Sequence, residues 1–290
     1  MLSKNSNVWI FLIVVVFLIM FVLITIRIPL ISSIMNDIKV IYEDKYIIVI
    51  EKPANVTVHS AKRWNGANVV DIISSRGYSL GESLLSDEQN GVVHRLDTNT
   101  SGILILAKDT MAQSILKDQF KNREPEKIYH ALVEGHIYPS EGTIDAPVGR
   151  LYNVLNRHGK KYKYDDTIRY FGVTPNGQES VTHYKTLKVF PNATLLEIKL
   201  ETGRTHQIRI HFSSIGHPLV GDGLYGANLK FARQIGVKHQ WLIAHQLSFT
   251  HPITREYMTF TAAYPSDLKR SLRLMYNNNN KLISYFPFFM

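Results

Sequence analysis

Short apolar runs alternate with charged and polar positions along most of the chain, from Asp37 to Pro265. Several runs have the β-branched content or the two-residue alternation that predicts strands. They are residues 39–42, 46–50, 92–93, 103–107 and 196–201. In the last of these runs apolar and charged residues alternate, which predicts a strand with one face in water.

Three other segments place apolar residues at the spacing of one helix face. The first spans Val69 to Ile73, the second follows Asp109 as a capping residue, and the third follows Thr205 and ends at Gly216. The expected inner faces are Ala112, Ile115, Leu116 and Phe120 in the second helix and Ile208, Phe212 and Ile215 in the third. Together the segments predict an α+β fold, mainly antiparallel sheet with packed helices.

The N-terminal segment differs from the rest because residues 9–26 are apolar except for Thr25. A run of this length is long enough to cross a bilayer as a helix. Lys4 precedes it and Arg27 follows it, so the positive-inside rule gives no orientation. Met35 opens a stretch that resembles the start of a soluble domain. The upstream run is therefore either a membrane anchor or the result of a start codon assigned too early.

These patterns divide the chain into three parts. Residues 1–34 form the apolar segment, residues 35–275 the main domain, and residues 276–290 a low-complexity and apolar tail. Within the tail, Asn277–Asn280 is expected to be a linker. The polar segment 150–180 is expected to be a long loop or hairpin of the main domain.

The net charge of the chain indicates which class of partner it binds. The formal net charge is +9, from 33 Lys and Arg against 24 Asp and Glu, and the pI is about 9.5. Such a basic balance is typical of proteins that bind polyanions. Residues 160–170 interleave lysines and an arginine with tyrosines, which suits looped or single-stranded RNA but also an exposed hairpin.

The residue types also exclude some chemistry. The chain has no cysteine, which rules out disulfides, thiol nucleophiles and cysteine metal sites. It has 12 histidines, but His206 and His211 are five positions apart, which is not a zinc-motif spacing, and no Glu completes a set. No glycine loop for phosphates is present. We therefore expect neither a metal nor a cofactor.

The most informative segment is residues 94–108, which read HRLDTNTSGILILAK. Asp97 lies there on a loop between two predicted strands, a position where catalytic groups are often placed. Arg95 can hold Asp97 ionised or contact a phosphate. On spacing alone, the simpler interpretation is an Arg–Asp pair that stabilises a turn.

This segment resembles the catalytic motif of RluA-type pseudouridine synthases, which isomerise uridine in RNA to pseudouridine. The match is ungapped, and the resemblance extends over about residues 38–268. It implies the pseudouridine synthase catalytic fold with Asp97 as the essential carboxylate, acting as nucleophile or base. It further implies that Arg95 helps to expel the target uridine from the RNA stack and that His94 contacts the substrate.

Two more blocks resemble the second and third motifs of that family, KIYHALVEG at 127–135 and LETGRTHQIRIH at 200–211. By this resemblance Tyr129 lies against the target base, because its ring offers a stacking face and a hydroxyl. Leu200 binds substrate and Arg204 pairs with Asp97. Without the resemblance, Tyr129 is an ordinary half-buried strand residue and Arg204 a structural arginine at a strand-to-helix turn.

One segment departs from the family pattern. In LIAHQLSFTHP, residues 242–252, Ile243 stands where the family usually has a histidine, and His245 follows two positions later. The sequence therefore supports no role for a histidine at this place.

The expected function is an RNA pseudouridine synthase that acts on a flipped-out uridine of single-stranded or loop RNA, in rRNA or tRNA. The isomerisation has no redox change and no net hydrolysis, which fits the absence of cofactor motifs. We expect a cytoplasmic monomer, with a membrane anchor at residues 9–26 as the alternative. Two other classes remain open: an inactive basic RNA-binding protein of the same fold, and a membrane-tethered interaction module.

Overall fold

The computed structural model describes residues 38–59, 68–81, 90–151 and 171–284, together with Val15, Val16 and Gly66; in the last helix it describes side chains as far as position 277. The chain divides into two units, Met1–Lys39 and Val40–Met290. Of the apolar run predicted at 9–26, only Val15 and Val16 are described, and both are helical. Within the described residues, no helix is both long and apolar enough to cross a membrane.

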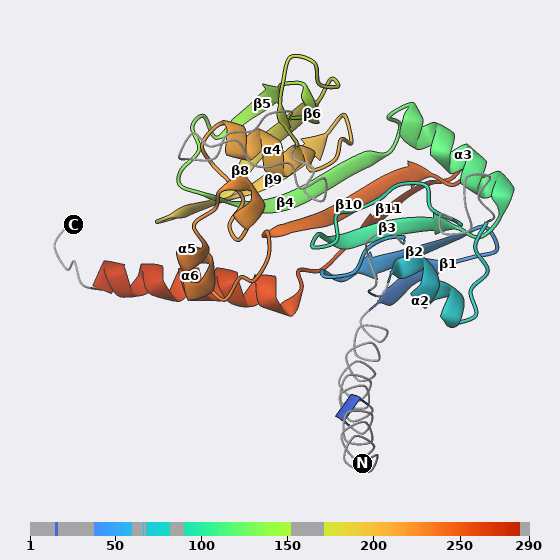
Figure 1. The fold of residues 1–290 in the computed structure, drawn as a ribbon, viewed down its shortest axis with the longest axis horizontal. Helices are drawn as coiled ribbons and strands as arrows, with labels where there is room; N and C mark the ends of the chain where they lie inside the picture. The colour runs from blue at the N-terminus through green and yellow to red at the C-terminus, as the bar shows by residue number, and fades with distance from the viewer. Residues whose placement is uncertain are drawn as a thin grey trace, which may run out of the picture. The chain divides into compact units, whose positions relative to one another are not determined.

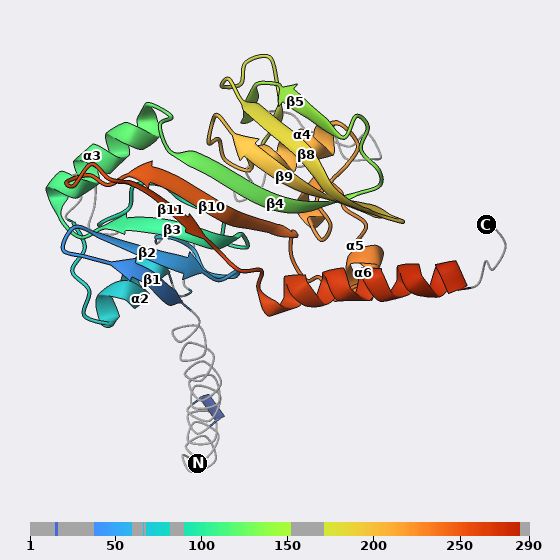
Figure 2. The same ribbon diagram turned by 180° about the vertical axis from the view of Figure 1, so that it is seen from behind.

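The second unit is built on a sheet whose described strands follow the order β1-β2-β3-β10-β4-β9-β8-β5, with β11 paired to β10. Figure 1 and the reverse view in Figure 2 show β4 and β10 side by side in the middle of this sheet. The strand bounds are β1 (Lys39–Glu43), β2 (Ile47–Lys52), β3 (Ser101–Ala107), β4 (Glu126–Glu134), β5 (Glu141–Asp145), β8 (Val181–Phe190), β9 (Ala193–Leu200), β10 (Leu242–Thr250) and β11 (Tyr257–Thr261).

Strand pairing agrees with the predicted class. The pairs β2–β3, β4–β9, β4–β10, β5–β8, β8–β9 and β10–β11 are antiparallel, whereas β3 and β10 run parallel. The predicted strands at 39–42, 46–50, 103–107 and 196–201 overlap β1, β2, β3 and β9. The predicted run at 92–93 forms only an isolated bridge, from Val92 to Leu106. The α+β class with a mainly antiparallel sheet is thus confirmed.

A separate two-stranded sheet pairs β6 (Val148–Arg150) with β7 (Phe171–Val173). These strands flank the segment between them, which belongs to the long loop or hairpin predicted within 150–180. The basic and aromatic stretch 160–170 lies outside the described residues.

The helices are α2 (Val69–Ser75), α3 (Thr110–Lys121), α4 (Gln207–Ser214), α5 (Leu229–Gln234) and α6 (Ser266–Ser284). Asp109 caps α3 as predicted, because its side chain accepts a hydrogen bond from the backbone N–H of Ala112 at 2.8 Å. In α4, Ile208 and Phe212 are buried, but the predicted inner-face residue Ile215 is 43% exposed. Ile215 lies at the C-cap, where the helix has already ended.

Both faces of the sheet are covered. Along β4, Leu132 belongs to one apolar cluster, whereas its neighbours Ala131 and Val133 belong to another. Successive strand residues point to opposite faces, so the clusters lie on opposite faces of the sheet. The first cluster includes Leu268 and Met275 of α6, and the second includes residues of α4. α4 is therefore anchored on one face by its own apolar side chains.

The linker predicted at Asn277–Asn280 is wrong, because α6 continues through it to Ser284. Asn is only a moderately poor helix former, at most about 0.7 kcal/mol per residue below Ala. The helix is also anchored upstream, where Trp241 donates a hydrogen bond to the buried Ser271 at 2.8 Å. Low complexity alone was a weak indicator of a break.

Candidate active site

Asp97 lies on the loop that leads into β3. Its backbone carbonyl accepts a hydrogen bond from the N–H of Thr100 at 3.0 Å, which closes a turn. Two residues further, Gly102 has a φ of 119°, and a Cβ built there would lie 2.2 Å from the carbonyl oxygen of Ala244. Only glycine allows β10 to approach β3 so closely. The glycine of the first motif therefore brings β10 to the end of the loop that carries Asp97.

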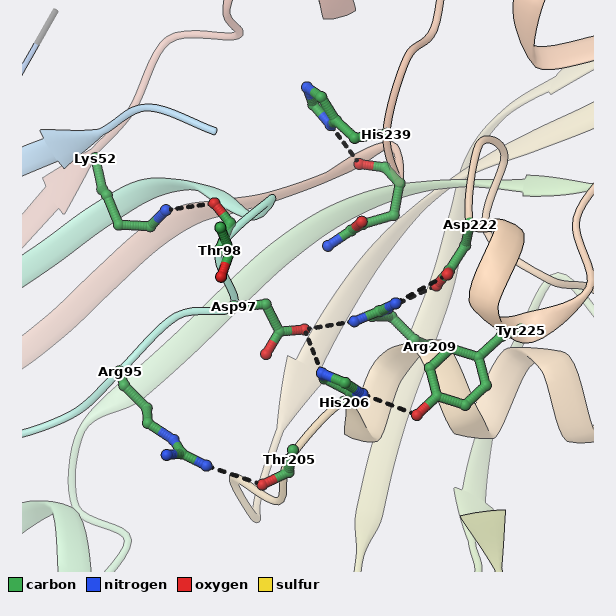
Figure 3. A network of polar contacts seen from close by, with 11 residues as sticks. Lys52, Arg95, Asp97, Thr98, Thr205, His206, Arg209, Asp222, Tyr225 and His239 are labelled. Carbon is green, nitrogen blue, oxygen red and sulfur yellow. Dashed lines mark hydrogen bonds and ion pairs between the residues drawn. The ribbon is translucent and has the colours of Figure 1, made fainter. Parts of the chain in front are cut away.

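Lys52, at the end of β2, fixes the backbone beside Asp97 (Figure 3). Its Nζ donates to the carbonyl oxygens of Pro53, Val56 and Thr98 at 2.8, 2.7 and 3.0 Å. These three acceptors match the three N–H groups of an ammonium. Burial lowers the pKa of Lys52 to about 7, against the opposite influence of the Asp97 charge. Nothing in the sequence distinguishes this residue, because one lysine near a strand end carries no distinctive pattern.

Arg209 of α4 forms the ion pair with the Asp97 carboxylate. Its Nη1 lies 3.2 Å from Asp97 Oδ2. Its Nε and Nη2 donate to Oδ2 and Oδ1 of the buried Asp222 at 2.6 and 2.9 Å, a two-bond arrangement that fixes the guanidinium plane. The guanidinium carbon also lies 4.9 Å from the centre of the Tyr225 ring. Asp222 and Tyr225 thus hold Arg209 with one nitrogen directed at Asp97.

The expected pair between Arg204 and Asp97 is therefore wrong, since Arg209 takes that place. The side chain of Arg204 donates from Nε to the carbonyl oxygen of Glu179 at 3.1 Å. Its backbone N–H donates to Oε1 of the buried Gln207 at 3.0 Å, which holds Arg204 on the turn before α4. Both arginines belong to the third motif, and spacing alone did not distinguish the turn residue from the helix residue.

Arg204 nevertheless lines the same cavity as Asp97 and Tyr129. Leu200 and Arg95 also line it. Burial, together with the Asp97 charge, raises the pKa of Tyr129, so its hydroxyl keeps its proton. The structure thus brings five of the six expected site residues around one cavity.

The sixth, His94, is directed elsewhere and is not among the residues that line the cavity. Its Nε2 accepts a hydrogen bond from the N–H of Ile105 at 3.2 Å, and its ring stacks on Phe120 with centroids 4.4 Å apart. Burial and the charge of Lys127 lower the pKa of His94 to about 3, so the ring is neutral. These contacts make His94 a support for the Asp97 loop, and the expected substrate contact finds no support.

Asp97 also lines a second cavity. Its lining includes polar residues such as Thr57, Thr98 and Gln240. Arg95 reaches its edge, where Nη2 donates to Thr205 Oγ1 at 3.0 Å.

Thr205 is not the cap of α4 that the sequence predicted. His206 occupies the N-cap position instead, in the left-handed conformation. His206 lines both cavities and lies 3.8 Å from Asp97, measured from Nε2 to Oδ2. In the sequence, His206 is notable only for its spacing from His211, which does not fit a metal site. His245, the histidine without a role, stacks on His130 with centroids 4.0 Å apart and lines neither cavity.

The comparisons with known proteins identify the family. The model of the RNA pseudouridylate synthase family matches residues 46–214, and the chain belongs to this family. An RNA pseudouridine synthase of Mycobacterium bovis, named as uncharacterized, is 42% identical over 236 residues, which are 81% of this chain and 72% of that protein. The ribosomal large subunit pseudouridine synthase D of Zymomonas mobilis is 34% identical over 267 residues, 88% of this chain and 80% of that one. The RluA-type assignment made from the motifs is thus confirmed.

Solved structures agree at the level of the fold. The human RNA pseudouridylate synthase domain containing 4 superposes with a TM-score of 0.63 at 22% identity, over 86% of this chain and 96% of that one. The human RNA pseudouridylate synthase domain containing 1 gives a TM-score of 0.61 at 24% identity, over 80% and 85%. The pseudouridine synthase fold expected from the sequence is thus confirmed.

Proposed function

We propose that this protein converts uridine in RNA to pseudouridine, with Asp97 as the essential carboxylate. The observation that carries the proposal is the Asp97 carboxylate, which is ion-paired with Arg209 and lines the same cavity as Tyr129. A half-buried carboxylate with a fixed cationic partner is suited to act as nucleophile or base.

The reaction breaks the bond from ribose C1′ to base N1 and forms one from C1′ to base C5. The proton leaves C5 and N1 gains one, so atoms and charge balance without an oxidant or a water molecule. The uridine must leave its stack to react, which costs a few kcal/mol. Tyr129 provides the stacking face for the extruded base, and Leu200 closes the apolar side of the cavity.

Arg95 and Arg204 are assigned to the RNA itself. Arg95 is exposed and lies at the junction of the two cavities, which suits a side chain that fills the space left by an extruded base. The Arg204 guanidinium has no carboxylate as hydrogen-bond partner among the described residues, and it is assigned to a phosphate. These roles follow the first and third motifs, with Arg209 replacing Arg204 at Asp97.

Ribosomal RNA is the favoured substrate, with transfer RNA as the second choice. Relatives from Zymomonas mobilis and Xanthomonas campestris, at 34% and 37% identity, are named ribosomal large subunit pseudouridine synthase D. A ribosomal substrate would place the protein in the cytoplasm.

The test uses the purified chain with ribosomal and transfer RNA transcripts that carry tritium at uridine C5. Each isomerisation releases one tritium to water, and digestion of the RNA then identifies pseudouridine. The Asp97→Asn variant, which keeps the shape and removes the charge, is the matched control. Binding of both proteins without tritium release would show an inactive RNA-binding protein and overturn the proposal.

A further inference from the structure

His206 has an unusual backbone for its position. Its φ and ψ are 58° and 19°, the left-handed region, although it is not a glycine. Such residues are uncommon, with His, Asn and Asp enriched among them, and the conformation is held only when surrounding contacts fix it. The contacts here come from both ends of the imidazole ring, from Asp97 and from Tyr225 (Figure 3).

The two contacts favour one of the two neutral forms of the ring. Nε2 faces Asp97 Oδ2 at 3.8 Å, and a carboxylate accepts hydrogen bonds but does not donate them. This favours the neutral form in which Nε2 carries the proton and Nδ1 has the lone pair. Nδ1 lies 2.8 Å from the hydroxyl of Tyr225, which is the donor in this form. Burial raises the pKa of Tyr225, so this hydroxyl keeps its proton.

The carboxylate of Asp97 is engaged on one oxygen only. Arg209 Nη1 and His206 Nε2 both lie nearest to Oδ2. No residue that the structure describes forms a hydrogen bond with Oδ1. The contact from His206 is longer than a hydrogen bond, and catalytic hydrogen bonds often shorten when the substrate binds. The geometry leaves Oδ1 for the substrate.

We propose that His206, held by Tyr225, is a positioning residue that orients the Asp97 carboxylate by donating from Nε2 to Oδ2. The proposal rests on the function proposed above and adds two residues to it. Asp222 contributes to the same orientation of Asp97, because it fixes Arg209, the other donor to Oδ2. The residues that orient Asp97 therefore come from two segments: His206 and Arg209 from the start of α4, and Asp222 and Tyr225 from the segment that follows it.

Protonation of His206 would disturb this arrangement. Burial lowers the pKa of His206 below the ordinary 6.5. The negative charges of Asp97 and Asp222 raise this pKa, whereas the positive charges of Arg209 and Arg95 lower it further. As the pH falls through this lowered value, Nδ1 gains a proton and Tyr225 has to turn from donor to acceptor. Asp97 then faces two cations on one oxygen and becomes a weaker nucleophile or base. The kcat of the wild-type protein is thus expected to fall on the acid side, below pH 6.5.

Three variants test the proposal in the full chain. His206→Gln keeps an N–H donor near the position of Nε2, whereas His206→Asn suits the left-handed backbone but is too short to reach Asp97. Losing a hydrogen bond to a charged group reduces rates roughly 10- to 100-fold. We expect that loss in kcat for His206→Asn, a loss of about threefold for His206→Gln, and unchanged KM for RNA in both. The histidine-dependent fall of kcat at acid pH should disappear in both variants.

Tyr225→Phe keeps the ring that packs on Arg209 and removes only the hydroxyl. It should lower kcat by about tenfold and should have little further effect in a His206→Asn background, because the two residues act as one unit. A His206→Asn variant with wild-type kcat and pH profile would overturn the proposal. So would fully additive losses in the double variant.

A readout without turnover separates this inference from the proposed function. Long-range ¹H–¹⁵N spectra of histidine-labelled protein report which nitrogen of His206 is protonated, and the His206→Asn variant assigns its signals. At neutral pH we expect the Nε2–H form, with a shift that changes in Asp97→Asn and Tyr225→Phe. The Nδ1–H form would refute the inference even in an active enzyme. An inactive wild-type protein with the Nε2–H form would refute only the proposed function.

Discussion

The Asp97 loop is held from two sides, and the two sides act on different parts of it. On one side, the Lys52 flank (Lys52 with Val56 and Thr98) contacts only backbone carbonyls. On the other side, the Arg209 flank (Arg209 with His206, Asp222 and Tyr225) contacts the carboxylate itself. The first flank therefore determines where the loop lies, and the second determines how the charge is held.

This difference separates stability from chemistry. Removing a cation that binds carbonyl oxygens leaves neutral acceptors without a partner. Each buried acceptor left unsatisfied lowers the free energy of unfolding by about 1–3 kcal/mol. Removing a cation that binds two carboxylates leaves charges behind, which costs about 3–5 kcal/mol in a buried pair. The Arg209 flank should thus be the more sensitive of the two in both activity and folding.

The largest effect is expected where both flanks converge. Asp97→Asn keeps the loop on Lys52 and removes the charge that Arg209 faces. Pseudouridine formation should fall to background, while RNA affinity changes by less than about tenfold, or 1.4 kcal/mol. Tritium release and filter binding on the same RNA measure the two quantities. Substantial turnover by this variant would show that the carboxylate is not essential.

The second largest effect tests the Arg209 flank. Arg209→Met keeps much of the side-chain volume but leaves Asp222, which is 2% exposed, without its ion pair. We expect a loss of about 3–5 kcal/mol in the free energy of unfolding and a roughly 10³-fold fall in kcat. Urea denaturation and single-turnover kinetics measure them.

The control is the double variant Arg209→Met with Asp222→Asn, which removes the buried charge that Asp222 would carry without its ion pair. It should recover much of the stability but not the activity, because Asp97 still lacks its partner. Recovery of both would mean that Arg209 supports the fold and has no part in the chemistry.

The Lys52 flank should show a smaller effect on the rate and a distinct dependence on pH. Lys52→Met should lower kcat roughly 10-fold through displacement of the loop, with KM for RNA unchanged. The pKa of Lys52 is about 7 in the folded chain and has its ordinary value of 10.5 in the unfolded chain. Between these values the unfolded chain holds a proton that the folded chain lacks. The free energy of unfolding should therefore rise with pH in this window, by at most about 1.4 kcal/mol per pH unit, and not below pH 7.

Urea denaturation of both proteins at pH 7 and pH 9 measures this slope. Lys52→Met lacks the titrating group and serves as the reference, so the difference between the two proteins isolates the contribution of Lys52. Equal slopes in both proteins would show that Lys52 is not buried as the structure has it.

The contrast between the flanks also explains what the sequence predicted and what it did not. The strands around Asp97, the cap at Asp109 and the positions of Asp97, Tyr129 and Leu200 followed from apolar patterning and ungapped motifs. Such features are local, since each depends on residues close together in the chain. The fold class was predictable for the same reason.

The supports of Asp97 come from distant segments. Lys52 lies on β2, far upstream, and Asp222 lies in the turn after α4, so only the folded chain brings them together. The left-handed conformation of His206 is likewise set by its tertiary contacts, not by its neighbours in sequence. The wrong choice of Arg204 over Arg209 arose here, because the residue that decides between them is Asp222.

The smallest effect is expected for Arg204, and it tests whether this correction holds. Arg204 lines the cavity but bonds the carbonyl of Glu179, so its loss leaves the Asp97–Arg209 pair intact. Arg204→Ala should keep kcat within about threefold at saturating RNA. It should weaken RNA binding and reduce the slope of log affinity against log salt by about 0.7, the contribution of one phosphate on a single strand. Arg204→Lys keeps the charge and should retain the wild-type slope. If Arg204→Ala instead abolished turnover at saturating RNA as Arg209→Met does, Arg204 would also be part of the chemistry, and the division between the two arginines would fail.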